Sequence, residues 1–219
     1  MPNLISRLRK LDSCALSDAL DSLGLPPAVS GINAQSVRRR IAGSAVTVKL
    51  VDKKQKRVGG PVRHLCTAAI EESNADNIVV IEQRTGLDAA AWGGVLSNAA
   101  KVKGISGVIV EGPARDIDEA AELDFPVYAR HSTARTARGR IYELDFNIEV
   151  KVGEVLVKPG TLVMADMSGV VFIQKDRAEE VLIIAERIVS KEKLMTAAVL
   201  KGKPVSVVMG ADYEKMLDQ

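Results

Sequence analysis

Two adjacent charged residues, Arg115 and Asp116, have the side chains best suited to chemistry in this sequence. The planar guanidinium of an arginine can grip a carboxylate with two hydrogen bonds. The carboxylate of Asp116 could hold a hard divalent cation. A small anionic substrate chelated to a metal would use both groups. Spacing alone also allows a structural interpretation, in which the pair is a helix cap or a surface salt bridge.

A glycine pair, Gly93-Gly94, lies upstream and begins a segment with helical periodicity. The pattern predicts a helix that stops at Gly104 and turns one apolar face to the core, formed by Val95, Leu96, Ala99, Ala100 and Val102. The first backbone amides of a helix lack intrahelical partners and lie at the positive end of its dipole. The amides of Gly94, Val95 and Leu96 could therefore hold a carboxylate or a phosphate.

The neighbouring elements predict how these groups are positioned. Residues 107–110 are an apolar run typical of a strand buried on both faces of a parallel sheet, and residues 111–113, Glu-Gly-Pro, indicate a turn. Arg115 and Asp116 would then follow the carboxyl end of a strand, which is where open α/β sheets bind ligands. Residues 41–51 and 77–82 predict two further strands. Asp88, in the loop before the glycine pair, is a possible second source of a carboxylate.

The two ends of the chain complete the expected fold. Helices are predicted over residues 2–11, from a cap at Ser13 to Gly24, from about Pro61 to 73 with His64 on it, and over 178–200. Residues 126–130 predict another strand. Short strands at 142–150, 155–157, 162–166 and 170–174 are closely spaced, which suggests an antiparallel or mixed section. We expect one α/β domain over residues 1–219, a layered sandwich with a mixed sheet.

Composition excludes several classes of function. Aromatic residues make up 3% and the net charge is +2, so the sequence gives little support for nucleic-acid binding. Cys14 and Cys66 lack zinc-site spacing, and we expect them to be reduced, buried thiols. The first residues lack the apolar core of a signal peptide, and no apolar run reaches membrane-spanning length. The expected location is the cytoplasm.

Three blocks of sequence resemble a known family. Residues 17–26 (Ser-Asp-Ala-Leu-Asp, then Leu-Gly-Leu-Pro), residues 93–116 and residues 157–171 match, in order, its opening helix, its active-site block and its closing strands. The chain is therefore similar to the 4-hydroxy-4-methyl-2-oxoglutarate aldolases and the regulator of ribonuclease activity A. The resemblance implies a swivelling-domain-like fold and a homotrimer, or a homohexamer, with sites between subunits.

For function, the resemblance implies a lyase that uses Mg²⁺ or Mn²⁺ to cleave or decarboxylate a small 2-oxo acid through a pyruvate enolate. Arg115 would bind substrate with the Gly94–Leu96 amides, and Asp116 would hold the metal. Gly94 stands where the aldolases carry a further aspartate, and Glu111 stands where aspartate is more usual. The alternative is a non-catalytic regulator of a ribonuclease that acts through protein contacts. Methyl transfer is disfavoured because no G-x-G-x-x-G follows a strand.

Overall fold

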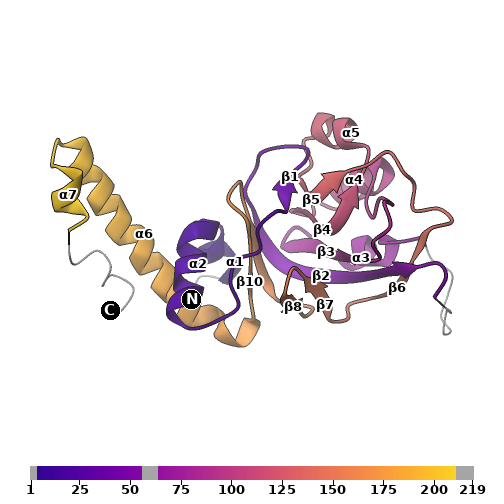
Figure 1. Cartoon of the computed structure of the whole chain (residues 1–219), viewed down its shortest axis with the longest axis horizontal. Coiled ribbons are helices and arrows are strands. Elements are labelled where there is room, and N and C mark those ends of the chain that lie inside the picture. The colour runs from indigo at the N-terminus through magenta and orange to yellow at the C-terminus, as the bar shows by residue number, and fades with distance from the viewer. Residues whose placement is uncertain (1–3, 56–63, 211–219) are drawn as a thin grey trace.

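A mixed sheet forms the centre of the protein (Figure 1). The computed structural model describes residues 4–55 and 64–210. The strand order is β1-β5-β4-β3-β2-β9-β10, and β6 also pairs with β2. Strands β2 to β5 run parallel, whereas β1, β6, β9 and β10 pair antiparallel with their neighbours. The strands are β1 Asn33–Ala34, β2 Ile41–Asp52, β3 Asn77–Gln83, β4 Gly107–Ala114, β5 Val127–Ser132, β6 Ile141–Phe146, β7 Val150–Val152, β8 Val155–Val157, β9 Leu162–Ala165 and β10 Val170–Ile173. The expected mixed α/β fold is confirmed.

Helices cover the sheet in separate groups. They are α1 Leu4–Leu8, α2 Ser13–Ser22, α3 Thr67–Glu72, α4 Gly94–Val102, α5 Ile117–Glu122, α6 Ala178–Leu200 and α7 Val205–Val208, with a 3₁₀ turn η1 at Lys175–Arg177. Helices α3, α4 and α5 pack with one face of the parallel strands. The opposite face packs on the antiparallel β7–β8 hairpin. Helices α1, α2 and α6 form a third core with β9 and β10.

Strand β4 connects the core to the candidate site, and all eight of its residues are buried. It continues through Glu111, Gly112 and Pro113, so the predicted turn at these residues is wrong. Its register with β5 shifts between Val110 and Pro113. A side chain on Gly112 would meet the Gln83 carbonyl oxygen at 2.8 Å, and its φ is +152°. The Gly-Pro pair thus marks an irregularity within the strand, as glycine often does.

Two helices do not begin where the sequence predicted. Asp12, not Ser13, caps α2, because its Oδ1 accepts a hydrogen bond of 2.9 Å from the Ala15 amide. The predicted start near Pro61 lies outside the described residues. Helix α3 begins at Thr67, so His64 precedes the helix.

The predicted bounds of α4 are confirmed, as is the predicted burial of Leu96 and Ala100, but Val95, Ala99 and Val102, also predicted to face the core, are exposed. Its buried residues are Gly94, Leu96, Ser97 and Ala100, while Val95 and Val102 are 83% and 90% exposed. The hydroxyl of Ser97 explains part of the difference between the predicted and observed buried faces, since it accepts a 2.9 Å hydrogen bond from the buried Trp92 indole. A polar residue therefore faces the core and apolar residues face outward.

The predicted α6 helix is confirmed at both ends, Ala178 and Leu200, but only its first half is buried. Its second half leaves the body of the molecule and ends in α7 (Figure 1). No described helix combines the length and the hydropathy needed to cross a bilayer.

Candidate functional site

Arg115 and Asp116 lie directly after β4, at the carboxyl edge of the parallel strands. Asp116 adopts a left-handed conformation, with φ 55°, before α5 begins. Its Oδ2 accepts a 2.9 Å hydrogen bond from the Gly94 amide and lies 3.3 Å from Nε of Arg115. The structure therefore brings together Gly94, Arg115 and Asp116, which the sequence analysis had selected.

The glycine pair allows this close approach. A side chain on Gly93 would place Cβ at 2.8 Å from Oδ2 of Asp116 and 3.3 Å from Nε of Arg115. The Asp116 carboxylate thus occupies the start of α4, where free amides and the helix dipole favour a negative charge. The Gly94 amide already has this partner, so the remaining first-turn donors toward a ligand are those of Val95 and Leu96.

A second carboxylate, Glu119, lies at Gly94, and the sequence analysis missed it. A Cβ on Gly94 would lie 1.8 Å from Oε2 of Glu119, so the carboxylate fills the space where a residue-94 side chain would begin. Nδ2 of Asn98 donates a 2.7 Å hydrogen bond to Oε1 of Glu119. An available signal was the spacing of Asp116 and Glu119, three residues apart at the start of a helix and therefore on neighbouring positions of its surface.

Asp88 does not take this position. Its Oδ2 lies 3.4 Å from Nε of Arg135, and both side chains are largely exposed. Asp88 does not line the cavity that contains Arg115 and Asp116. The carboxylate beside Gly94 therefore comes from the following helix, α5, and not from the preceding loop.

A cavity of about 490 Å³ opens beside Arg115 and Asp116. The side chain of Trp92 is buried, stacks on Phe125 at a centroid distance of 6.2 Å and also lines the cavity. Trp92 therefore both anchors the loop that precedes α4 and forms part of the cavity wall. The lining residues combine apolar groups with charges: His64, Leu65, Thr67, Ala90, Trp92, Gly93, Val95, Leu96, Arg115, Asp116, Thr136, Ala137, Arg138, Ile141, Tyr142 and Glu143. The volume suits a small molecule.

The cavity lining also includes a buried carboxylate, Glu143, whose Oε2 accepts a 2.5 Å hydrogen bond from the Cys66 amide. Burial, with a contribution from the Glu143 charge, raises the pKa of the Cys66 thiol well above its usual value. This thiol is therefore protonated at neutral pH and is a poor nucleophile. Cys14 is exposed, so the expectation that both thiols are buried is wrong for Cys14.

Few metal-binding side chains surround the glycine pair. Among the described residues, no three histidine, cysteine, aspartate or glutamate side chains are grouped closely enough to hold an ion. The carboxylates at the glycine pair are those of Asp116, which lines the cavity, and of Glu119, which lies at Gly94 outside the cavity lining. Mg²⁺ is commonly held by one or two carboxylates, with substrate and water oxygens filling the remaining positions. The residues fit a magnesium-type site that substrate completes, and they do not fit a closed protein cage.

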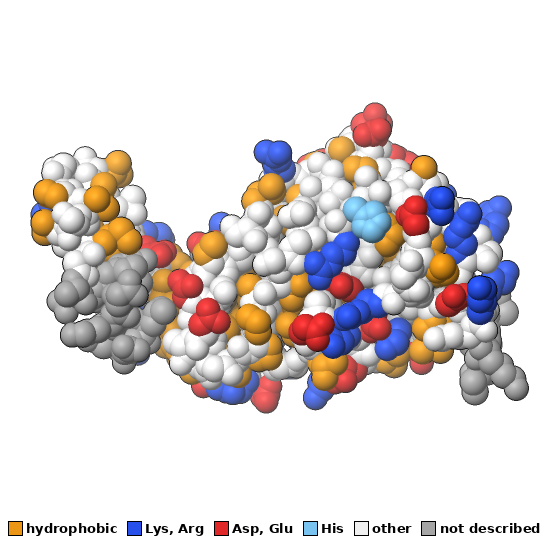
Figure 2. Space-filling view, viewed as in Figure 1, with side chains coloured by type: hydrophobic (Ala, Val, Ile, Leu, Met, Phe, Trp, Pro, Cys, Tyr) orange, Lys and Arg blue, Asp and Glu red, His pale blue; other side chains and the backbone are white. Residues whose placement is uncertain are grey.

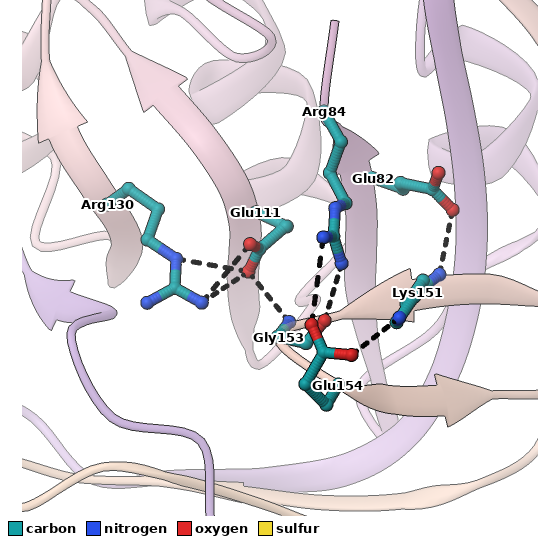
Figure 3. Close-up of polar contacts among 7 residues, drawn as sticks. All are labelled: Glu82, Arg84, Glu111, Arg130, Lys151, Gly153 and Glu154. Atoms are coloured by element: carbon teal, nitrogen blue, oxygen red, sulfur yellow. Dashed lines mark hydrogen bonds and ion pairs between the residues drawn. The ribbon is translucent and has the colours of Figure 1, made fainter. Parts of the chain in front are cut away.

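Glu111 belongs to a different site on the opposite face of the sheet (Figure 3). Its carboxylate accepts hydrogen bonds from Nε and Nη2 of Arg130 and from the Gly153 amide, at 2.8 to 3.1 Å. The backbone amide of Lys151 donates to Glu82 at 2.7 Å. These contacts fasten the β7–β8 hairpin to the sheet, so Glu111 has a structural role.

The fold and the site together define a mixed α/β protein that holds an Arg-Asp pair against the glycine start of a helix, at the carboxyl edge of its parallel strands. The chain belongs to the RraA-like family, described as Aldolase/RraA, whose sequence model matches residues 13–172. The family resemblance noted from the sequence is thereby confirmed.

Individual relatives are moderately similar. Protein DlpA of Legionella pneumophila is 29% identical over 90% of this chain, which corresponds to only 32% of that protein's length. A putative 4-hydroxy-4-methyl-2-oxoglutarate aldolase of Halalkalibacterium halodurans is 29% identical over 84% of this chain and 83% of its own. The crystal structure of an uncharacterized protein from Pseudomonas syringae superposes with a TM-score of 0.84 at 25% identity, covering 94% of this chain and 96% of that one.

Proposed function

We propose that this protein is a divalent-metal-dependent lyase that cleaves or decarboxylates a small 2-oxo acid, of the 4-hydroxy-4-methyl-2-oxoglutarate aldolase and oxaloacetate decarboxylase type. The observation that carries the proposal is the meeting of Arg115, Asp116 and Glu119 at the Gly93-Gly94 start of α4. Membership of the RraA-like family and the name of the Halalkalibacterium relative support the same class of activity.

Asp116 and Glu119 would hold Mg²⁺ or Mn²⁺. When bound, such an ion supplies Lewis acidity toward the 2-oxo and carboxylate oxygens of the substrate. Only one oxygen of Asp116 is used by Gly94 and Arg115, and among the described residues Oδ1 has no hydrogen-bond partner. That oxygen is therefore the one available for a cation.

Arg115 would orient the substrate and stabilise its charge. Its side chain is 39% exposed and lines the cavity. Within the described ranges its one ion pair uses Nε, so the terminal nitrogens are available to a carboxylate or to the 2-oxo oxygen. As the C–C bond breaks, negative charge develops on that oxygen, where a prepositioned cation lowers the barrier. The amides of Val95 and Leu96 would add donors at the same end of α4.

The decisive test is a steady-state assay of oxaloacetate decarboxylation, following pyruvate with and without Mg²⁺. EDTA should abolish turnover, and Mg²⁺ or Mn²⁺ should restore it. Asp116→Asn, with a folding check by circular dichroism, should lose activity and Mg²⁺ affinity together. Metal-independent turnover above the rate without enzyme would overturn the metal-dependent mechanism. A folded wild type with no turnover on oxaloacetate or on 4-hydroxy-4-methyl-2-oxoglutarate would overturn the lyase.

The second candidate is a non-catalytic regulator of a ribonuclease that acts through protein contacts. It is favoured by the family description, which includes RraA, and by Gly94, where the aldolases carry aspartate. Glu119 weakens the argument from Gly94, because its carboxylate lies at that position. Inhibition of a ribonuclease by a wild-type protein without lyase activity would favour the regulator. Assembly as a homotrimer or homohexamer and a cytoplasmic location remain predictions from the sequence.

A further inference from the structure

A second cavity, of about 570 Å³, lies at the amino edge of the parallel strands, at the opposite end of the sheet from Arg115 and Asp116. Its lining comes from the start of β2, from the segments directly before β4 and β5, and from the ends of α1 and α4. It shares no lining residue with the cavity of the candidate site. The eight residues of β4 separate the two edges by roughly 25 Å.

The lining of this second cavity is basic. Among the described residues it includes one carboxylate, Asp124, and four cationic side chains, Arg9, Arg39, Arg40 and Lys101. All five side chains are about half exposed, between 44% and 57%. Over the middle of the face shown in Figure 2, by contrast, basic and acidic side chains are interspersed. A hollow lined mainly by one sign of charge attracts ligands of the opposite sign.

Part of this charge has a structural role at Asp124. Nη2 of Arg39 donates a hydrogen bond to the Asp124 carboxylate, and Nζ of Lys101 donates one of 2.9 Å to the Asp124 carbonyl. Basic side chains often satisfy carbonyl groups near the end of a helix in this way, and Asp124 lies just after α5. Arg39 and Lys101 alone would therefore be explained as a clamp on this loop.

The clamp does not explain Arg9 and Arg40. Nη2 of Arg9 donates to the Ala75 carbonyl at 3.1 Å and to the Asp76 carboxylate at 2.8 Å, and Nη1 of Arg40 donates to the Leu11 carbonyl at 2.6 Å. Within the described part of the chain, Nε and Nη1 of Arg9 and Nη2 of Arg40 have no hydrogen-bond partner. Each guanidinium is therefore held by one of its terminal nitrogens and keeps donors for an anion.

Negative groups nearby do not cancel the positive charge. Two carboxylates outside the lining, Asp76 and Asp166, lie 2.8 and 3.9 Å from two of the arginines. Arg38 and Lys103, which are exposed and next in sequence to lining residues, offset them and form no ion pair within the described ranges. The carboxyl ends of α4 and α5 add only about half a negative charge each. An excess of positive charge therefore remains.

We propose that this cavity binds a small molecule through a di- or triphosphate group. Its cations come from three separate segments, so an extended anion meets more of them than one phosphate can, and its volume is that of a small-molecule site. The apolar lining side chains Ile41, Ile105 and Phe125 are at most 4% exposed, so an organic group has little to contact. Recognition therefore rests on phosphate oxygens, which inorganic polyphosphate and a nucleoside triphosphate share. The inference does not depend on the lyase activity.

Isothermal titration calorimetry of the full chain, in metal-free buffer of low ionic strength, tests the site with three probes. We expect inorganic tripolyphosphate to bind at least about tenfold more tightly than sulfate, because the longer anion meets more of the cations. A Kd for adenosine triphosphate equal to or above that of tripolyphosphate would identify the phosphate chain alone as the ligand, and a lower Kd would identify a nucleotide. No binding of tripolyphosphate, or binding no tighter than that of sulfate, would overturn the proposal.

Substitutions of opposite sign locate the binding. Arg9→Gln with Lys101→Gln removes two cations and should raise the Kd for tripolyphosphate at least about tenfold. Asp124→Asn removes the competing carboxylate and should lower the Kd about threefold, and asparagine tolerates the left-handed φ of 50° at this position. The matched control is Lys191→Gln with Lys193→Gln on α6, which removes the same charge outside the cavity and should change the Kd less than about twofold.

The variants also separate this site from the candidate site. Arg115→Lys should bind tripolyphosphate like the wild type, and circular dichroism should show that every variant is folded. A weaker Kd in Arg115→Lys would assign the binding to the candidate site and overturn the proposal. An unchanged Kd in Arg9→Gln with Lys101→Gln, an equal loss in the control, or no gain in Asp124→Asn would overturn it as well, since the cations would then serve only as a clamp.

Discussion

Two arginine–carboxylate pairs, Arg130–Glu111 and Arg115–Asp116, lie in or directly after strand β4. They differ in how many hydrogen-bond partners their carboxylates have. Glu111 has a side chain 11% exposed, and Arg130 and the Gly153 amide donate to its oxygens (Figure 3). Asp116 is 38% exposed and has one amide and one arginine partner, both on the same oxygen. The first pair is complete without a ligand. The second leaves hydrogen-bonding capacity facing a cavity, which is the pattern expected of a binding site.

The largest effect should follow substitution of Arg115. A lysine keeps the charge but loses the planar fork. If Arg115 stabilises charge at the reacting oxygen, Arg115→Lys should lower kcat/KM about 100-fold or more, because removal of one such donor lowers kcat roughly 10²–10³-fold. Steady-state kinetics on oxaloacetate with Mg²⁺ measure this change. The control is Arg135→Lys, 64% exposed and outside the cavity, which should change kcat/KM less than about threefold.

An unchanged melting temperature in Arg115→Lys would sharpen the contrast with Glu111. Kinetics close to wild type would show that Arg115 is structural, and the distinction between the Glu111–Arg130 pair and the Arg115–Asp116 pair would then fail.

The second largest effect should follow substitution in the Glu111–Arg130 pair, which we assign a structural role. Glu111→Gln removes a charge that faces Arg130, and we expect a loss of about 2–3 kcal/mol in the free energy of unfolding, since hydrogen bonds to charged groups are the stronger class. Urea unfolding measures the loss. The matched control is Glu154→Gln, whose side chain is 84% exposed and whose ion pairs lie at the surface, so its effect on the free energy of unfolding should be much smaller than that of Glu111→Gln. A loss in Glu111→Gln no larger than in the control would contradict a structural role.

A third effect concerns the space that Glu119 fills beside Gly94. Gly94→Ala should displace the Glu119 carboxylate without replacing it, and we expect about a tenfold loss of kcat/KM, in the range for groups that support a metal site. Gly94→Asp displaces the same carboxylate but supplies another, so activity should return to near the wild-type level. Glu119→Gln should resemble Gly94→Ala. Equal activity in Gly94→Ala and wild type would show that the Glu119 carboxylate is not used.

The smallest effect concerns Asp166, a third carboxylate with well-defined partners. Burial raises the pKa of Asp166, but hydrogen bonds from the hydroxyl and amide of Ser13 and from the Ser168 amide outweigh it, leaving the pKa below its usual value. A lowered folded-state pKa stabilises the protein above the unfolded pKa, and that stability is lost as the pH falls through the folded value.

Ser13→Ala should therefore cost about 1 kcal/mol in the free energy of unfolding at pH 7, the usual net worth of one hydrogen bond. Denaturant unfolding at pH 7 and at successively lower, acidic pH should show the difference from wild type shrinking, because the stability that the ionised Asp166 contributes is lost as the pH falls through its lowered folded-state pKa. A difference independent of pH would mean that packing, and not the charge of Asp166, carries the effect.

The sequence predicted those features that depend on neighbouring residues. Arg115 and Asp116 could be placed at the end of β4 because an apolar run precedes them directly, and α6 could be bounded because its periodicity is long. Glu119 was missed because its approach to Gly94 depends on how α5 packs beside α4. The face of α4 was only partly predicted, because periodicity counts Val95 and Val102 as core residues and cannot detect the Trp92–Ser97 hydrogen bond that turns Ser97 toward the core.

The position of β2 at the centre of the sheet has a consequence for biosynthesis. Strand β2 pairs with β3, β6 and β9, and its partner β9 does not begin until Leu162. Such long-range pairing is slow to form, because the intervening chain must first be closed into a loop. At translation rates of roughly 5–20 residues per second, one side of β2 waits about 5–25 s for β9 to be synthesised. During that interval the nascent chain exposes an unpaired strand edge, to which chaperones can bind and through which chains can aggregate.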